Sequence, residues 1–190
     1  MKIKEATAYI LDRLMNELPA ELTYHRLSHT LDVVEQARRI ALSENVLDAQ
    51  ELALLETAAY FHDSGFMETY EKHEEKGCEI AQNILPFYDY SPSEITAICT
   101  IIMATKIPQS PTNKLSEIIC DADLDYLGRE DFFEIGQRLY QELLFKNLVK
   151  NKKQWDEIQL SFLGKHHYFT KTNIESRNAV KLKNIEMIKK

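Results

Sequence analysis

Glycine and proline are scarce in this chain of 190 residues, which contains only five of each. Together they fall well below the ~12% that is usual in globular proteins. Tight turns depend on these two residues, so their scarcity argues against an all-β fold and favours long helices joined by short connections. The sequence also has no apolar run of the ~18 residues that a membrane-spanning helix needs.

Cysteine is scarce as well, and the three cysteines, Cys78, Cys99 and Cys120, share no metal-binding spacing. An odd number of cysteines suits a reducing compartment. The N-terminal segment, MKIKEATAYILDRL, carries acidic residues within its apolar pattern and lacks the core of a signal peptide. We therefore expect a cytoplasmic protein with no membrane partner.

Positive charge is in deficit, with 23 basic against 30 acidic side chains and a net charge of −7. This balance argues against a protein that covers nucleic acid with its whole surface. The charge is also uneven: residues 1–145 carry 12 basic and 26 acidic side chains, whereas residues 146–190 carry 11 basic and 4 acidic ones. The basic C-terminal part is either a solvated face or a surface that attracts an anionic ligand.

Apolar residues recur at helical spacing along nearly the whole chain. Hydrophobic residues, with Ala, Tyr and Cys counted among them, make up 44% of the chain, which is enough to bury a core. Eight stretches show the pattern: 8–15, 31–41, 52–61, 73–85, 93–104, 131–148, 155–164 and 173–189. Residues 118–120 (Ile-Ile-Cys) are the only short strand candidate. The sequence predicts an all-α, single-domain helical bundle of about eight helices.

Two of the six histidines fall at matching positions of neighbouring predicted helices. His29 lies near the start of the second helix, and His62 lies near the end of the third. At 1.5 Å per residue, the second helix rises by roughly 21 Å and the third returns by the same distance. A short connection makes such helices antiparallel, so we expect His29 and His62 at the same level of the bundle.

Carboxylates accompany these histidines. Asp63 follows His62 directly, and an acidic turn expected after the apolar residues 118–120 carries Asp121 and Asp123. Two imidazoles with one or two carboxylates form a mixed nitrogen and oxygen ligand set for a divalent metal. That set suits Mn²⁺, Fe²⁺, Zn²⁺, Ni²⁺ or Mg²⁺ and leaves positions open for water.

These residues resemble the H…HD…D signature of the HD superfamily of metal-dependent phosphohydrolases. The surrounding segments are similar too: YHRLSHTLDV at 24–33, AAYFHD at 58–63 and CDADL at 120–124. The resemblance extends from about residue 20 to residue 128 and implies an HD-type helical bundle. Residues 129–190 would then add the C-terminal helices that complete a single domain over residues 1–190.

The resemblance implies that His29, His62, Asp63 and Asp123 bind the metal, with one or two ions per chain. By the family pattern Asp123 is the fourth ligand, and Asp121 is its neighbour outside the ligand shell. The family hydrolyses phosphomonoesters or phosphodiesters, commonly of nucleotides. We therefore expect a phosphatase or phosphodiesterase that acts on a small, nucleotide-like phosphorylated substrate through metal-activated water, with Asp63 among the catalytic residues.

His25 is the candidate general acid. The segment from Tyr24 to Val33 also resembles the signature of cyclic-nucleotide phosphodiesterases, in which the first histidine protonates the leaving oxygen. His25 precedes His29 by four residues, so on one helix both would share a face, with His25 one turn above the metal. An imidazole with a pKa near 6.5 is suited to donate a proton at neutral pH. The alternative is a histidine at the helix start that faces water or caps the backbone.

Six further side chains are weaker candidates for a second metal or for the substrate. They are His73, Asp121, Glu68, Lys106, His166 and Arg177. His73 lies in the region where HD proteins with two metals place an extra histidine. Lys106 and Arg177 are cations that could contact a phosphate.

A regulatory role is the second functional hypothesis. HD domains also serve as modules that sense a ligand, with little or no catalytic activity. The complete ligand set favours an enzyme, because a retired site has no reason to keep four buried polar side chains.

Overall fold

The computed structural model describes all 190 residues, and every regular element in it is helical. The α-helices are α1 (Ile3–Glu17), α2 (Leu27–Ser43), α3 (Ala49–Phe61), α4 (His73–Ile84), α5 (Pro92–Ala104), α6 (Lys114–Asp123), α7 (Phe132–Phe145), α8 (Lys152–Lys165) and α9 (Lys171–Ile188). Three short 3₁₀ helices are η1 (Ser64–Met67), η2 (Leu85–Tyr88) and η3 (Asp125–Gly128). The predicted all-α class is confirmed. No helix has the length and apolar character that crossing a membrane requires.

Helix α6 is the element that the sequence did not predict. The Ile118-Ile119 pair suggested a strand, and Asp123 was expected in a turn, yet both belong to this helix. Its ten residues begin at Asn113, whose side chain accepts a hydrogen bond from the backbone N–H of Ser116. Helix α6 is short, and six of its ten residues are buried, so it offers few turns over which a helical period can be recognised.

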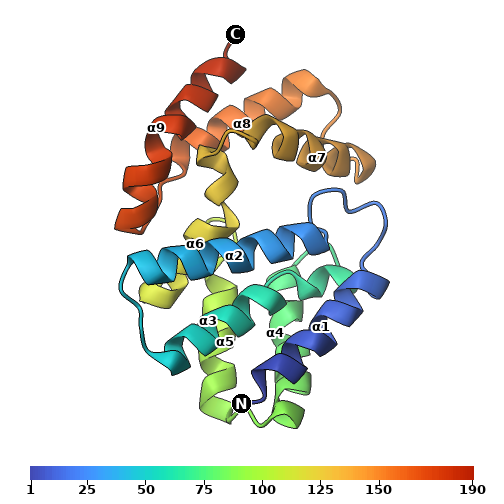
Figure 1. The fold of residues 1–190 in the computed structure, drawn as a ribbon. Helices are drawn as coiled ribbons and strands as arrows, with labels where there is room; N and C mark the ends of the chain where they lie inside the picture. The colour runs from blue at the N-terminus through green and yellow to red at the C-terminus, as the bar shows by residue number, and fades with distance from the viewer.

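The first six helices pack around one apolar core of 28 buried residues. Helix α2 packs against both α3 and α6, and α5 packs against α3 and α4 (Figure 1). Phe61, the last residue of α3, is fully buried in this core. The end of α3 is therefore fixed in position, along with the residues that follow it.

Helices α7, α8 and α9 form a second group at one end of the molecule, beyond α2 and α6 (Figure 1). A smaller cluster of six buried residues, which includes Tyr24, Tyr126 and Phe132, joins this group to the segments before α2 and after α6. The buried carboxylate of Asp125 in η3 strengthens the junction, because it accepts hydrogen bonds from Arg39 on α2 and Arg177 on α9.

Candidate metal centre

His62 and Asp63 lie where α3 ends and the chain turns into η1. His62 is 1% exposed, and its Nδ1 lies 2.8 Å from the carbonyl oxygen of Ala59. A carbonyl oxygen can only accept, so Nδ1 carries the proton and Nε2 is free to bind a metal. Asp63 is also buried, at 6% exposure.

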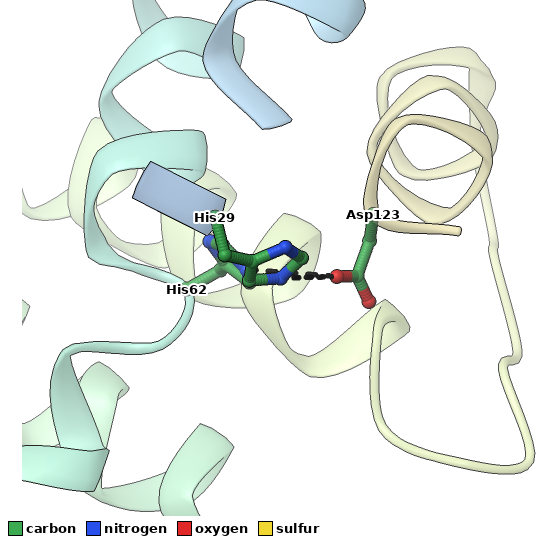
Figure 2. Close-up of side chains that lie close together, drawn as sticks. All are labelled: His29, His62 and Asp123. Carbon is green, nitrogen blue, oxygen red and sulfur yellow. Dashed lines mark hydrogen bonds and ion pairs between the residues drawn. The ribbon is translucent and has the colours of Figure 1, made fainter. Parts of the chain in front are cut away.

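His29 and Asp123 complete a cluster drawn from three helices. His29 lies in the first turn of α2, and its Nε2 is 3.1 Å from Oδ1 of Asp123, the last residue of α6. His29 Nε2 is also 3.4 Å from Oδ2 of Asp63, and His62 Nε2 is 3.3 Å from the same oxygen. One ligand atom each of His29, His62 and Asp123 lie within 4.8 Å of one another (Figure 2). His29 and His62 thus lie together, as predicted for the ends of α2 and α3, and α6 supplies Asp123.

The hydrogen bonding of the cluster is incomplete. His62 Nε2 and Asp63 Oδ2 are buried and have no hydrogen bond of acceptable geometry, although they lie 3.3 Å apart. Buried polar atoms are nearly always paired in folded proteins. A divalent cation between the two side chains would satisfy both, so the residues present fit a metal ion.

The charges of the cluster also favour a bound cation. Burial opposes ionisation of Asp63 and Asp123, but the neighbouring histidines keep the pKa of Asp63 well below its usual range and that of Asp123 at about 2. Burial likewise disfavours the charged form of His62, yet these two carboxylates raise its pKa well above 6.5. The centre therefore holds negative charge that either a proton or a metal ion can neutralise.

His73 lies on the other side of Asp63. Its Nε2 is 3.7 Å from Asp63 Oδ1 and 3.4 Å from Oε1 of Glu74, which is buried. The position of His73 depends on a close approach between the turn after α3 and the start of α4. A Cβ atom on Gly65 would lie only 1.9 Å from the carbonyl oxygen of His73, so only glycine fits there. The two oxygens of Asp63 thus face different histidines.

His25 does not share a helical face with His29, contrary to the prediction. Helix α2 begins at Leu27, and His25 lies in the bend before it. Its ring stacks on Phe66, with 4.2 Å between the ring centroids, and Phe66 stacks in turn on His73 at 3.9 Å. Phe66 thus packs against both histidines, whose own rings lie 6.1 Å apart and are tilted by 45° to each other.

Glu142 on α7 is the residue that the sequence analysis missed. It is fully buried, and its carboxylate accepts hydrogen bonds from the backbone N–H groups of Tyr24 and His25. Its Oε1 lies 2.5 Å from His25 Nδ1 and accepts a hydrogen bond from the Tyr70 hydroxyl at 3.0 Å. Burial disfavours a charged His25, but the hydrogen bond to Glu142 together with the charges of Asp63, Glu142 and Asp123 raises the pKa of His25 above 6.5. The only signal in the sequence is an acidic residue within an apolar stretch, which is too common to be informative.

Comparison with known protein families identifies the fold. The HD domain family matches residues 26–125, more than half of the chain. The chain belongs to the HD domain family. His29, His62, Asp63 and Asp123 all fall within the matched residues, whereas His25 and Glu142 lie outside them.

Two solved structures share this HD fold. One is described as a predicted HD superfamily hydrolase from an uncultured Thermotogales bacterium, with a TM-score of 0.56 and 24% identity over 85% of this chain and 86% of that one. The other is a protein from Lactobacillus plantarum, with a TM-score of 0.66 and 19% identity over 100% of this chain and 97% of that one. No curated protein matches the sequence.

Asp121 points away from the HD centre, which is the cluster of His29, His62, Asp63 and Asp123. Its carboxylate accepts hydrogen bonds from the backbone N–H groups of Phe169 and Thr170 and from the Thr170 hydroxyl, where α9 begins. Burial outweighs these hydrogen bonds and raises the pKa of Asp121 to about 6. Residues two apart face nearly opposite sides of a helix, so Asp121 holds α9 while Asp123 faces the histidines.

Lys106 and Glu68 were candidates that the structure does not bring to the HD centre. Lys106 forms an ion pair with Glu75, at 43% exposure of its side chain. Glu68 is exposed and pairs with Lys76 at 3.4 Å. Both residues lie close in sequence to the predicted site, but their side chains point to solvent and not to the HD centre.

Arg177 and His166 belong to the α9 side of the molecule. Arg177 donates to the buried Asp125 at 2.9 Å, which makes it part of the junction rather than of the HD centre. His166 follows α8, and its Nδ1 lies 3.2 Å from the Lys181 Nζ. Burial, and then Lys181, lower the pKa of His166 to about 3.

A cavity of about 400 Å³ opens beside the HD centre, between it and helices α7 and α8. Asp63, Asp123, His25 and His73 line one end. The other end is apolar, and Trp155, the only tryptophan of the chain, lies there. This volume lies within the roughly 300–1,000 Å³ that is common for small-molecule sites. The cavity therefore has room for a ligand in contact with Asp63 and Asp123, two of the candidate metal ligands.

Proposed function

We propose that this HD protein is a metal-dependent hydrolase of phosphate esters. The observation that supports the proposal best is the pair of buried atoms His62 Nε2 and Asp63 Oδ2, which no hydrogen bond satisfies. They lie beside His29 and Asp123, and Asp63 and Asp123 line a cavity of small-molecule size. The complete ligand set favours an enzyme over the regulatory alternative, because a site without chemistry has no reason to keep these buried polar side chains.

The metal would be held by His29, His62, Asp63 and Asp123. A bound divalent ion lowers the pKa of water to supply a nucleophile and offsets the charge of a phosphate. The position of Asp63 between His62 and His73 is compatible with one or two ions per chain. The ligand types suit Mn²⁺, Fe²⁺, Zn²⁺, Ni²⁺ or Mg²⁺.

His25 would protonate the leaving oxygen. Its Nδ1 is hydrogen-bonded to Glu142, so the proton for the substrate comes from Nε2, the other ring nitrogen of a residue that lines the cavity. The raised pKa of His25 keeps a larger share of it charged at neutral pH. Glu142 is then a positioning residue that fixes the tautomer and the orientation of the ring.

The substrate would be a small phosphorylated compound, nucleotide-like as the family resemblance implies. Purified protein is assayed for bound metal by mass spectrometry and then for hydrolysis of p-nitrophenyl phosphate, bis-p-nitrophenyl phosphate and a nucleotide panel with each divalent metal. The variant Asp63→Ala should lose metal and activity while remaining folded. Asp12→Ala, which removes an exposed carboxylate from α1, is the matched control and should change neither.

Two results would contradict the proposal. A protein that binds none of these metals would remove its basis. A protein that binds metal but hydrolyses no ester would favour the regulatory alternative, in which the HD centre only recognises a ligand.

A further inference from the structure

The cavity beside the HD centre is lined by no lysine or arginine. Its charged or titratable lining residues are the carboxylates of Asp63, Asp123 and Glu74, together with two histidines. Glu74 is 6% exposed and has no lysine or arginine partner. Beyond the metal ions and His25, which a first phosphoryl group would engage, a second or third phosphoryl group would find no lysine or arginine and would face a buried carboxylate.

Two lysines close to the cavity are engaged elsewhere. Lys106, next to the lining residues Thr105 and Ile107, is paired with Glu75. Lys146 lies 3.5 Å from a carboxylate oxygen of Glu21 and sits over the Tyr70 ring at 5.3 Å from its centroid. Neither lysine lines the cavity. A polyphosphate would have to break one of these contacts to gain either lysine as a partner.

The far wall of the cavity is apolar and comes from α7, α8 and η3. It includes Leu127, Leu139, Leu143, Trp155, Ile158 and Phe162. Leucine, isoleucine and aromatic side chains favour a ligand surface that is itself apolar, because contact removes both surfaces from water. A sugar phosphate without an apolar group would leave this wall without a matching surface.

One polar side chain interrupts the apolar wall. Gln159 on α8 lines the cavity and is 7% exposed, and its amide forms no hydrogen bond with any protein group. The amide packs against Gly136 of α7, where an added Cβ would lie 3.0 Å from Nε2. An amide offers one acceptor and two donors, and that of Gln159 has no protein partner and lines the cavity. A ligand that carries a matching donor and acceptor would satisfy it.

From these features we infer that the substrate is a phosphomonoester with a single phosphoryl group on a largely apolar body whose far edge hydrogen-bonds Gln159. The inference rests on the proposed hydrolase function and specifies its substrate class. Hydrolysis of such an ester forms a bond from phosphorus to a water oxygen and breaks the bond to the ester oxygen. The ester oxygen takes a proton, and the products are an alcohol and inorganic phosphate.

Kinetics with matched substrates test the single phosphoryl group and the apolar body. The holoprotein is assayed with nucleoside 5′-monophosphates, the corresponding di- and triphosphates, and ribose 5-phosphate, which lacks the base. We expect kcat/KM for the best monophosphate to exceed that for its triphosphate and for ribose 5-phosphate at least tenfold, about 1.4 kcal/mol each. Equal or better use of the triphosphate, or equal use of ribose 5-phosphate, would overturn the inference while leaving the hydrolase function intact.

Binding gives a readout that does not depend on turnover. Trp155 is the only tryptophan and lines the cavity, so its fluorescence reports on ligand binding. Phenylphosphonate cannot be hydrolysed as an ester, and it should change the fluorescence of the metal-loaded protein at a concentration at least tenfold lower than methylphosphonate. Similar titrations for the two phosphonates would overturn the inference even if no hydrolysis is ever detected.

Gln159→Met tests the hydrogen-bonding edge with little change of volume. We expect it to lower kcat/KM for the best nucleoside monophosphate about tenfold and to leave the affinity for phenylphosphonate, which lacks such an edge, within twofold. Gln141→Met, at an exposed position of α7, is the control and should change neither. If Gln159→Met leaves the nucleoside monophosphate unaffected, Gln159 does not contact the substrate.

Discussion

Replacement of Glu142 by glutamine should separate the positioning of His25 from metal binding. In the wild-type protein four groups donate to this carboxylate: two backbone N–H groups, the His25 ring and the Tyr70 hydroxyl. A glutamine side chain has a single acceptor oxygen, so its NH₂ group would face at least one donor. The substitution also removes the negative charge that favours a protonated His25.

The expected loss can be estimated from the contacts. A hydrogen bond to a charged group contributes roughly 1.5–3 kcal/mol, and about 1.4 kcal/mol corresponds to a factor of ten in rate. Positioned acid catalysis contributes typically about 10²–10⁴-fold to an enzymatic rate, and a misplaced imidazole retains part of it. We therefore expect Glu142→Gln to lower kcat by roughly 10–100-fold, because the His25 hydrogen bond weakens.

The pH profile gives the sign of the effect. A general acid works in its protonated form, so activity falls as the pH rises through its pKa. Glu142 raises the pKa of His25, against the effect of burial. Without that carboxylate the pKa of His25 falls, and the alkaline limb of the kcat profile should move to lower pH.

The assay measures kcat from pH 5.5 to 9, with metal content determined on the same samples. Glu134→Gln on α7, whose side chain is 69% exposed, is the matched control and should behave as wild type. His25→Ala should abolish the alkaline limb and leave the metal content unchanged. A Glu142→Gln protein with the wild-type rate and pH profile would refute the positioning role, and a loss of metal would show that Glu142 supports the HD centre itself.

Three further predictions concern stability. Gly65→Ala should lower the free energy of unfolding by roughly 1–3 kcal/mol in urea titrations, because the new Cβ meets the His73 carbonyl oxygen; an unchanged midpoint would disprove that close approach. His166 has a pKa of about 3 in the folded protein against about 6.5 when unfolded, so the unfolded chain binds the extra proton and stability should fall as the pH drops from 6.5 towards 3. A His166→Gln variant should lose that part of the pH dependence, and an identical dependence would contradict it. Added metal at about 100 times its dissociation constant should stabilise the folded state by roughly 2.7 kcal/mol, so chelation should lower the melting temperature. A melting temperature that changes with neither metal nor chelator would argue against metal binding at the HD centre.

Local sequence determined the class of the fold and the core of the HD centre. Helical periodicity is a property of neighbouring residues, and the short link between α2 and α3 makes the two helices antiparallel. That geometry alone places His29 beside His62, with Asp63 next in the chain. The juxtaposition of these residues with Asp123 follows the H…HD…D resemblance and is present in the structure.

Errors arose where a helix is short and mostly buried, and where a residue was placed on a helix that begins after it. Helix α6 was missed because it has only ten residues, six of them buried, and its apolar pair Ile118-Ile119 also suits a strand. Helix α2 starts at Leu27, two residues after His25, so the expected shared face does not exist. Neighbourhood in sequence also suggested Lys106 and Glu68, whose side chains point elsewhere.

Only the tertiary structure revealed what surrounds the centre. Glu142 lies 117 residues after His25, and Gln159 lies on yet another helix, so no local pattern links them to the HD residues. Their contacts depend on how α7 and α8 pack over the segment before α2, which is decided by the small apolar cluster around Tyr24 and Phe132. The placement of His29, His62 and Asp63 follows from helix geometry over short distances in the chain, and that of Asp123 from the family pattern. The partners of His25 and the walls of the cavity follow from packing between distant helices.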